Sequence, residues 1–300
     1  MFLEQLINGL TLGCMYALIA LGYTLVFGVI RVIFFAQGEL SMISAFIGIG
    51  TLSLFGGSGN VGGLSYAMIL VVFLFSALGT TVVGVIGERI ALRPIREAPR
   101  TTQLITSLGL SIVLQNIVFL AISSGNIAFP PFVPSKSFNF GPMTINSIQV
   151  FIILLSIVLM ISLDSFVRKT RLGLAMRASA ESHKLSKLTG ININRTITIT
   201  FIVGSCLASV AGIMMGLYDG VAKYDMGFMP GIKAFTAAIL GGIGNVRGGM
   251  LGGILIGLIE SLGAGYVSAD YKDLFSFLIL IGILVARPSG LLGEQISKTD

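Results

Sequence analysis

The side chains that could do chemistry in this sequence are few and widely spaced. It has one histidine, His183, and two cysteines, Cys14 and Cys206, which both lie inside apolar segments. An active site needs a nucleophile with an acid and a base, or a cluster of metal ligands. Neither combination occurs, so the sequence predicts no catalytic residue and no metal site.

A nucleotide-binding motif is also missing. The glycine-rich run Gly241-Gly242-Ile243-Gly244-Asn245 lacks the lysine and the preceding strand that a phosphate-binding loop requires. We therefore expect the chain to bind no cofactor, and any use of ATP to belong to a partner protein.

Three ionisable residues lie close to apolar segments, namely Glu39, Lys233 and Glu260. Such groups at mid-membrane would bind a coupling ion or relay protons in a secondary transporter. All three lie near the ends of their segments, where a long side chain can extend to water. We interpret them as interfacial charges.

The segment Phe34–Glu39 is the exception, because polar Gln37 and flexible Gly38 interrupt two apolar runs. A broken helix that lines a substrate path and an ordinary tight cytoplasmic turn both fit this pattern. The candidate residues for a translocation path are Phe35, Gln37, Gly38, Glu39, Gly241 and Gly242.

The elements that would position these residues are membrane-spanning helices. The chain is 54% hydrophobic and 11% charged, whereas soluble domains carry roughly 25% charged residues. A helix crosses the hydrocarbon core with ~20 apolar residues. Uncharged runs lie at Gln5–Ile30, Leu40–Phe55, Tyr66–Gly87, Gln103–Ile122, Ser147–Leu163, Thr196–Leu217, Ala234–Ile243, Met250–Ile259 and Leu274–Ala286.

These runs predict an all-α polytopic bundle of 8–9 transmembrane segments in a single domain, residues 1–300. The first run follows Glu4 rather than a basic region, so we expect a retained span. Ala234–Ile243 is short and runs into glycines, which indicates a re-entrant or broken helix. Small residues four apart in Gly9/Gly13 and in Gly249/Gly253/Gly257 predict close helix contacts.

Basic residues decide the orientation. The net charge of +6 comes from groups that lie between the apolar runs, so we expect contact with the lipid bilayer and none with nucleic acid. Cytoplasmic connections carry the excess of Lys and Arg. The connections around Arg89–Arg100 and Arg168–Arg195 are basic, which places the N-terminus outside and the C-terminus in the cytoplasm.

The connection at about 168–195 has helical spacing from Leu174 to Leu188, with Ala178, Glu181 and Leu185 on one face and Gly190 as a helix stop. A passive basic loop at anionic lipid would explain its charges. The small residues Ala178 to Ala180 favour docking into a protein groove instead.

Three segments resemble the permeases of ABC importers for branched-chain amino acids, of the LivH type. The first is Asn8–Gly28 followed by Phe35-Ala-Gln-Gly-Glu39, in which Gln37 stands where the family has His. The second runs from Arg177-Ala-Ser-Ala-Glu181 to Gly190-Ile191, with Ser182 where an acidic residue is common. The third combines Lys233–Gly253 with Arg287-Pro-Ser-Gly-Leu-Leu-Gly293.

The resemblance implies a permease subunit of a bacterial inner-membrane importer. Its partners would be a second related permease, two ABC ATPase subunits that use ATP and Mg²⁺, and an external solute-binding protein. Within this picture the coupling helix that meets the ATPase comprises Arg177, Ala178, Ala180, Glu181, Leu185, Gly190 and Ile191.

Related permeases serve urea and short amides, so these solutes remain an alternative. A stand-alone secondary transporter or channel is a second alternative, and it would transport without an ATPase. An intramembrane enzyme is disfavoured, because His, Asp and Cys groups are scarce within the apolar runs.

Overall fold

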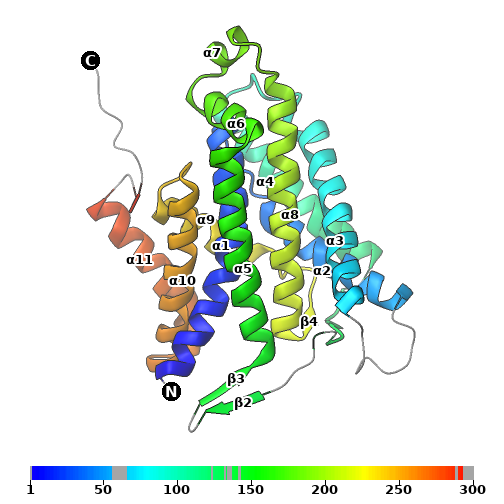
Figure 1. Ribbon diagram of the computed structural model, residues 1–300, viewed down its shortest axis with the longest axis vertical. Coiled ribbons are helices and arrows are strands. Elements are labelled where there is room, and N and C mark those ends of the chain that lie inside the picture. The colour runs from blue at the N-terminus through cyan, green and yellow to red at the C-terminus, as the bar shows by residue number, and fades with distance from the viewer. Residues whose placement is uncertain are drawn as a thin grey trace.

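The computed structural model describes residues 2–55, 66–122, 124–131, 133, 137–140, 143–287 and 290–292. This part of the chain forms a bundle of long helices (Figure 1). The helices are α1 (Phe2–Ile30), α2 (Gln37–Phe55), α3 (Tyr66–Gly87), the π-helical turn η2 (Glu88–Leu92), α4 (Arg100–Ala121), α5 (Ser147–Lys169), α6 (Arg171–Glu181), α7 (His183–Leu188), α8 (Ile193–Asp219), α9 (Phe228–Gly241), α10 (Val246–Tyr266), the 3-10 turn η3 (Ala269–Tyr271) and α11 (Lys272–Ala286).

Among the described residues, 7 helices are long and apolar enough to cross a membrane. The shorter α9 and α11, of 14 and 15 residues, add two apolar segments. Together they match the predicted polytopic bundle. The two ends of the bundle differ, because α6 and α7 lie at one end and the β2–β3 hairpin lies at the other (Figure 1). We call the end with α6 and α7 the basic end.

Short strands cover the end opposite the basic end. Strand β2 (Ser137–Phe140) pairs antiparallel with β3 (Met143–Asn146). Strand β1 (Ile127–Ala128) pairs antiparallel with β4 (Val221–Ala222), which joins the region after α4 to the end of α8. Gly220 ends α8 with a φ of 69°, a left-handed conformation that glycine adopts without steric cost.

The core is centred on α1, whose residues from Cys14 to Leu21 are at most 4% exposed. Its longest contact is with the antiparallel α10, where the predicted glycine faces meet. A Cβ atom on Gly9 would lie 2.9 Å from the Cα of Leu258, and one on Gly13 would lie 2.8 Å from the Cα of Ile254. Small residues let two helices pack at backbone distance inside a membrane, so the predicted contact is confirmed.

Candidate functional site

Helix α2 begins inside the bundle rather than at its surface. The Gln37 side chain donates through Nε2 to the carbonyl oxygen of Gly204, 2.8 Å away on α8, and it is 1% exposed. It also packs against Gly22, which precedes the end of α1 by about eight residues, or ~12 Å of helix. Residues 31–36 therefore turn back into the bundle, and that this segment lines a substrate path stays a prediction.

Helix α9 begins in contact with the start of α2, although its first residues, Phe228 and Met229, are exposed. A Cβ atom on Gly38 would meet the carbonyl oxygen of Gly227 and would lie 2.8 Å from the Cα of Gly231. The first turns of the two helices therefore touch through their backbones. This position requires glycine, and it brings two helix N-termini, each with a partial positive charge, close together in the interior.

Aromatic rings and one carboxylate surround this meeting point. The ring of Phe35 lies 5.6 Å from that of Phe235, and the ring of Tyr23 lies 5.8 Å from Phe235. Glu39 is 1% exposed, and its Oε1 accepts a hydrogen bond from the Ser111 hydroxyl at 3.3 Å. Its Oε2 has no hydrogen-bond partner among the described residues. The expectation that Glu39 extends to water is wrong, because helix α4 covers it.

Lys233 and Glu260 are likewise buried, at 4% and 3% exposure. Lys233 Nζ lies 2.7 Å from Glu260 Oε1 on α10 and 2.6 Å from Asp273 Oδ1 on α11, and it stands over the ring of Tyr16. The interfacial interpretation is therefore wrong for these two residues as well. Each charge can stay inside because the neighbouring helices provide its counter-charge.

The structure places Gly241 and Gly242 far from Phe35–Glu39, at the other end of α9. Gly241 packs against the backbone of Gly248 on α10. The backbone after α11 covers this turn, since the amide of Leu292 donates to the carbonyl of Gly241 at 3.1 Å. The six candidate path residues thus form two groups, and only the group at Phe35–Glu39 lies at the meeting point of the two helix starts.

The predicted coupling helix is two helices. Ser182 adopts an extended conformation, ends α6 and caps α7 by accepting from the amide of Leu185. The expectation of one helix from Leu174 to Leu188 is wrong, because a serine hydroxyl competes for backbone amides and favours a helix start. The predicted stop at Gly190 is present, with a φ of 81°.

The faces of this segment divide between solvent and bundle. Arg177, Glu181 and Leu185 are exposed, while Ala178, Ala180 and Ile191 are partly buried. Ser179 is 1% exposed and faces the bundle. Some of the small residues therefore pack α6 against its own chain. The sequence interpretation had assigned all of them to contact with a partner protein.

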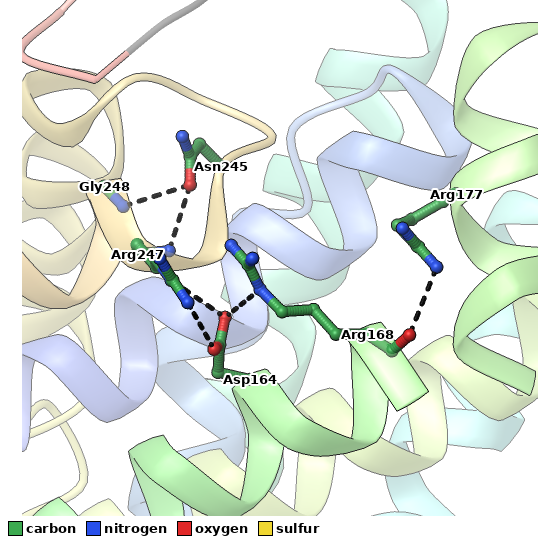
Figure 2. Close-up of polar contacts among 6 residues, drawn as sticks. All are labelled: Asp164, Arg168, Arg177, Asn245, Arg247 and Gly248. Carbon is green, nitrogen blue, oxygen red and sulfur yellow. Dashed lines mark hydrogen bonds and ion pairs between the residues drawn. The ribbon is translucent and has the colours of Figure 1, made fainter. Parts of the chain in front are cut away.

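Polar contacts hold α6, α5 and α10 together at the basic end (Figure 2). Asp164 accepts from Arg168 at 2.8 Å and forms an ion pair with Arg247 at 3.2 Å. Arg177 donates to the carbonyl oxygen of Arg168 at 3.3 Å. Asn245 caps α10 by accepting from the amides of Arg247 and Gly248. Arg247 thus ties α10 to α5, and Arg177 ties α6 to the end of α5.

A cavity of about 750 Å³ opens between α6, the start of α8 and the connection before α4. Its lining includes Arg31, Arg96, Glu181 and His183. Arg96 bonds to Asn194 and pairs with buried Glu88. Burial lowers the pKa of the Arg96 guanidinium, and Glu88 acts in the opposite direction. Sequence reasoning predicted a functional role for α6 but none for Arg31, although Arg31 is a lone charge directly after the first apolar run.

Interior helix starts, buried charges and a basic peripheral helix pair define a polytopic membrane transport protein rather than a passive anchor. Residues 5–284 match the family described as the branched-chain amino acid transport system / permease component. The chain belongs to this family.

Similar proteins cover nearly the whole chain. The permease protein BraD of a high-affinity branched-chain amino acid transport system of Pseudomonas aeruginosa is 43% identical, over 98% of this chain and 96% of that protein. The permease protein LivH of Escherichia coli is 41% identical, with the same coverage. Among solved structures, PsaBC from Streptococcus pneumoniae in complex with Fab matches with a TM-score of 0.48 and 11% identity, over 94% of this chain and 90% of that one.

Proposed function

We propose that this chain is a permease subunit of an ATP-driven importer for branched-chain amino acids in a bacterial inner membrane. The observation that carries the proposal is the 41–43% identity, over 98% of the chain, to permeases of high-affinity branched-chain amino acid systems. Urea or a short amide is the alternative solute. Its only support is the resemblance of the sequence motifs to permeases that include carriers of these solutes.

The partners follow from the same proposal. A second permease subunit completes the path, two ABC ATPases hydrolyse ATP with Mg²⁺ at the basic end, and an external solute-binding protein delivers the solute at the opposite end. Helices α6 and α7 form the docking element for the ATPase. The exposed side chains of Arg177, Glu181 and Leu185 at the basic end support this assignment.

The interior group around Phe35–Glu39 suits the proposed solute. The rings of Phe35 and Phe235 offer apolar surface to a branched side chain. Two helix starts favour a carboxylate, and the free oxygen of Glu39 favours an ammonium group. A zwitterion with an apolar side chain therefore matches the chemistry of this group better than uncharged urea does.

Uptake by the reconstituted complex tests the solute and the energy source together. We expect ATP-dependent accumulation of leucine in proteoliposomes that contain the full complex with its binding protein, and no accumulation of urea. Accumulation of urea in place of leucine would overturn the solute, and leucine uptake by this chain alone without ATPase would show a secondary transporter.

A charge reversal tests the docking element. The Glu181 side chain is exposed and only its backbone carbonyl contacts Arg31, so Glu181→Lys should leave the bundle intact. We expect normal membrane insertion, loss of ATPase co-purification and loss of ATP-driven uptake. Asp270→Lys, an exposed reversal at the opposite end, should retain the ATPase. Unchanged uptake with Glu181→Lys would contradict the assignment.

A further inference from the structure

Two side chains join the α6–α7 pair directly to the end of α1. The Nη2 of Arg31 donates to the carbonyl oxygens of Ala180 at 2.9 Å and Glu181 at 3.3 Å. In return, the Nε2 of His183 donates to the carbonyl oxygen of Val29 at 2.7 Å. We call Arg31 and His183, with these carbonyls, the α1–α6 link.

The link satisfies groups that both helix ends leave unpaired. The last carbonyls of a helix have no partner within it and carry a partial negative charge. Arg31 supplies a cation at the end of α6, and His183 supplies a donor at the end of α1. Each helix therefore holds the end of the other, and charge-assisted donors make such bonds stronger than neutral ones.

The backbone at Arg31 is unusual. Its φ is 60°, and it is the non-glycine residue with a positive φ among those the structure describes. This left-handed conformation is sterically unfavourable for a residue with a side chain. The chain adopts it where α1 ends and the segment 31–36 turns back into the bundle, so the guanidinium is tied to the point where the chain reverses.

The segment that follows has little freedom to absorb movement. The amide of Phe35 donates to the Ser107 hydroxyl at 2.6 Å, and the Tyr23 hydroxyl donates to the carbonyl of Phe35 at 3.3 Å. Gln37 is held by Gly204, and Gly38 rests on the backbone of α9. A shift at Arg31 must therefore reach the meeting point of α2 and α9 within a few residues.

We propose that the α1–α6 link is the positioning contact through which a movement of α6 reaches the interior helix starts. Arg31 and His183 touch no solute and act through residues 31–36. This inference rests on the proposed function, since it takes α6 as the element that the ATPase moves. The tie through Arg177 leads instead to the carbonyl oxygen of Arg168 in the last turn of α5 (Figure 2).

Substitution of Arg31 separates transmission from docking. Arg31→Asn removes the guanidinium, and asparagine tolerates a positive φ. In the reconstituted complex we expect retained ATPase co-purification and ATP hydrolysis, with leucine moved per ATP reduced about tenfold, the order of loss that corresponds to one charge-assisted hydrogen bond. Arg31→Lys should recover part of the ratio. Arg89→Asn, at an exposed arginine in η2, should keep the wild-type ratio.

His183 provides an independent test if Arg31→Asn fails to fold. His183→Ala should lower the same ratio while His183→Gln, which keeps a donor, restores it. The double variant should be no worse than the stronger single variant, because both act through one link. A wild-type ratio in Arg31→Asn and in His183→Ala would overturn the link, and so would loss of ATPase binding in both. If Glu181→Lys leaves docking and uptake intact, the assignment of α6 and α7 as the docking element fails instead. The proposed function fails if the wild-type complex shows no ATP-dependent leucine uptake.

Discussion

At the level of single residues, the buried acidic groups of this bundle differ in the partners that surround them. Glu260 lies 2.7 Å from Lys233, and the lysine also reaches Asp273. Glu39 has only the Ser111 hydroxyl, at 3.3 Å, as its hydrogen-bond donor among the described residues. The first arrangement neutralises charge and stabilises helix packing. The second leaves one carboxylate oxygen without a hydrogen-bond partner among the described residues.

Removal of Lys233 should therefore destabilise the protein. In Lys233→Met, Glu260 keeps a buried charge without its counter-charge, and breaking a buried pair costs about 3–5 kcal/mol. We expect a lower thermal unfolding temperature in detergent and less protein in the membrane. Lys272→Met replaces an exposed lysine at the start of α11, next to Asp273, and provides the matched control.

A second substitution distinguishes loss of charge balance from loss of packing. Lys233→Met with Glu260→Gln removes both charges and should recover part of the lost stability. Equal instability of the single and double variants would show that Lys233 acts through its packing and not through its charge.

At the level of elements, helices α2 and α9 depend on contact between their first turns. Helix α9 has 14 residues and cannot span a membrane unaided, and α2 starts in the interior. Their backbone contact at Gly38, Gly227 and Gly231 lets both begin there. A single methyl group at Gly38 would meet backbone atoms, which cannot move aside as a side chain can.

Gly38→Ala should separate the two helix starts. Overpacking of this kind typically costs about 1–3 kcal/mol, so we expect a lower unfolding temperature and reduced leucine uptake. Gly50→Ala lies on the same helix, where an added Cβ meets nothing within 4 Å. It should equal or slightly exceed the wild type in stability. Wild-type stability and uptake in Gly38→Ala would contradict the contact.

At the level of the whole molecule, the helix pairs α1–α2 and α8–α9 run in opposite directions. Helix α1 runs to the basic end, the chain turns back, and α2 begins inside and runs to the opposite end. Helix α8 runs to the opposite end, the chain turns back, and α9 begins inside and runs to the basic end. Inverted arrangements of this kind place interior helix starts at the substrate site of many transporters.

Cysteine labelling of whole cells tests the proposed orientation. Asn126 lies at the opposite end and Lys184 at the basic end, and both are exposed. With a membrane-impermeant thiol reagent, Asn126→Cys should react in intact cells and Lys184→Cys only after permeabilisation. The parent chain, whose Cys14 is buried, sets the background. The reverse pattern would place the basic end outside.

The sequence by itself determined the class of fold and the family. Long uncharged runs separated by arginines are sufficient for the fold class, because each membrane helix satisfies its own backbone and must be apolar along its length. The family followed from the motifs in three separate segments, Asn8–Glu39, Arg177–Ile191 and Lys233–Gly293. The glycine faces of α1 and α10 were also predictable from their spacing, since residues four apart share a helix face.

Only the tertiary structure decided which charges are buried and where the chain turns back. Lys233, Glu260 and Asp273 are far apart in sequence, and their pairing depends on the packing of α9, α10 and α11. The same holds for Gln37 on Gly204 and for Arg31 on the end of α6. A side chain near the end of an apolar run can extend to water or pair inside, and only the position of its neighbours decides between the two.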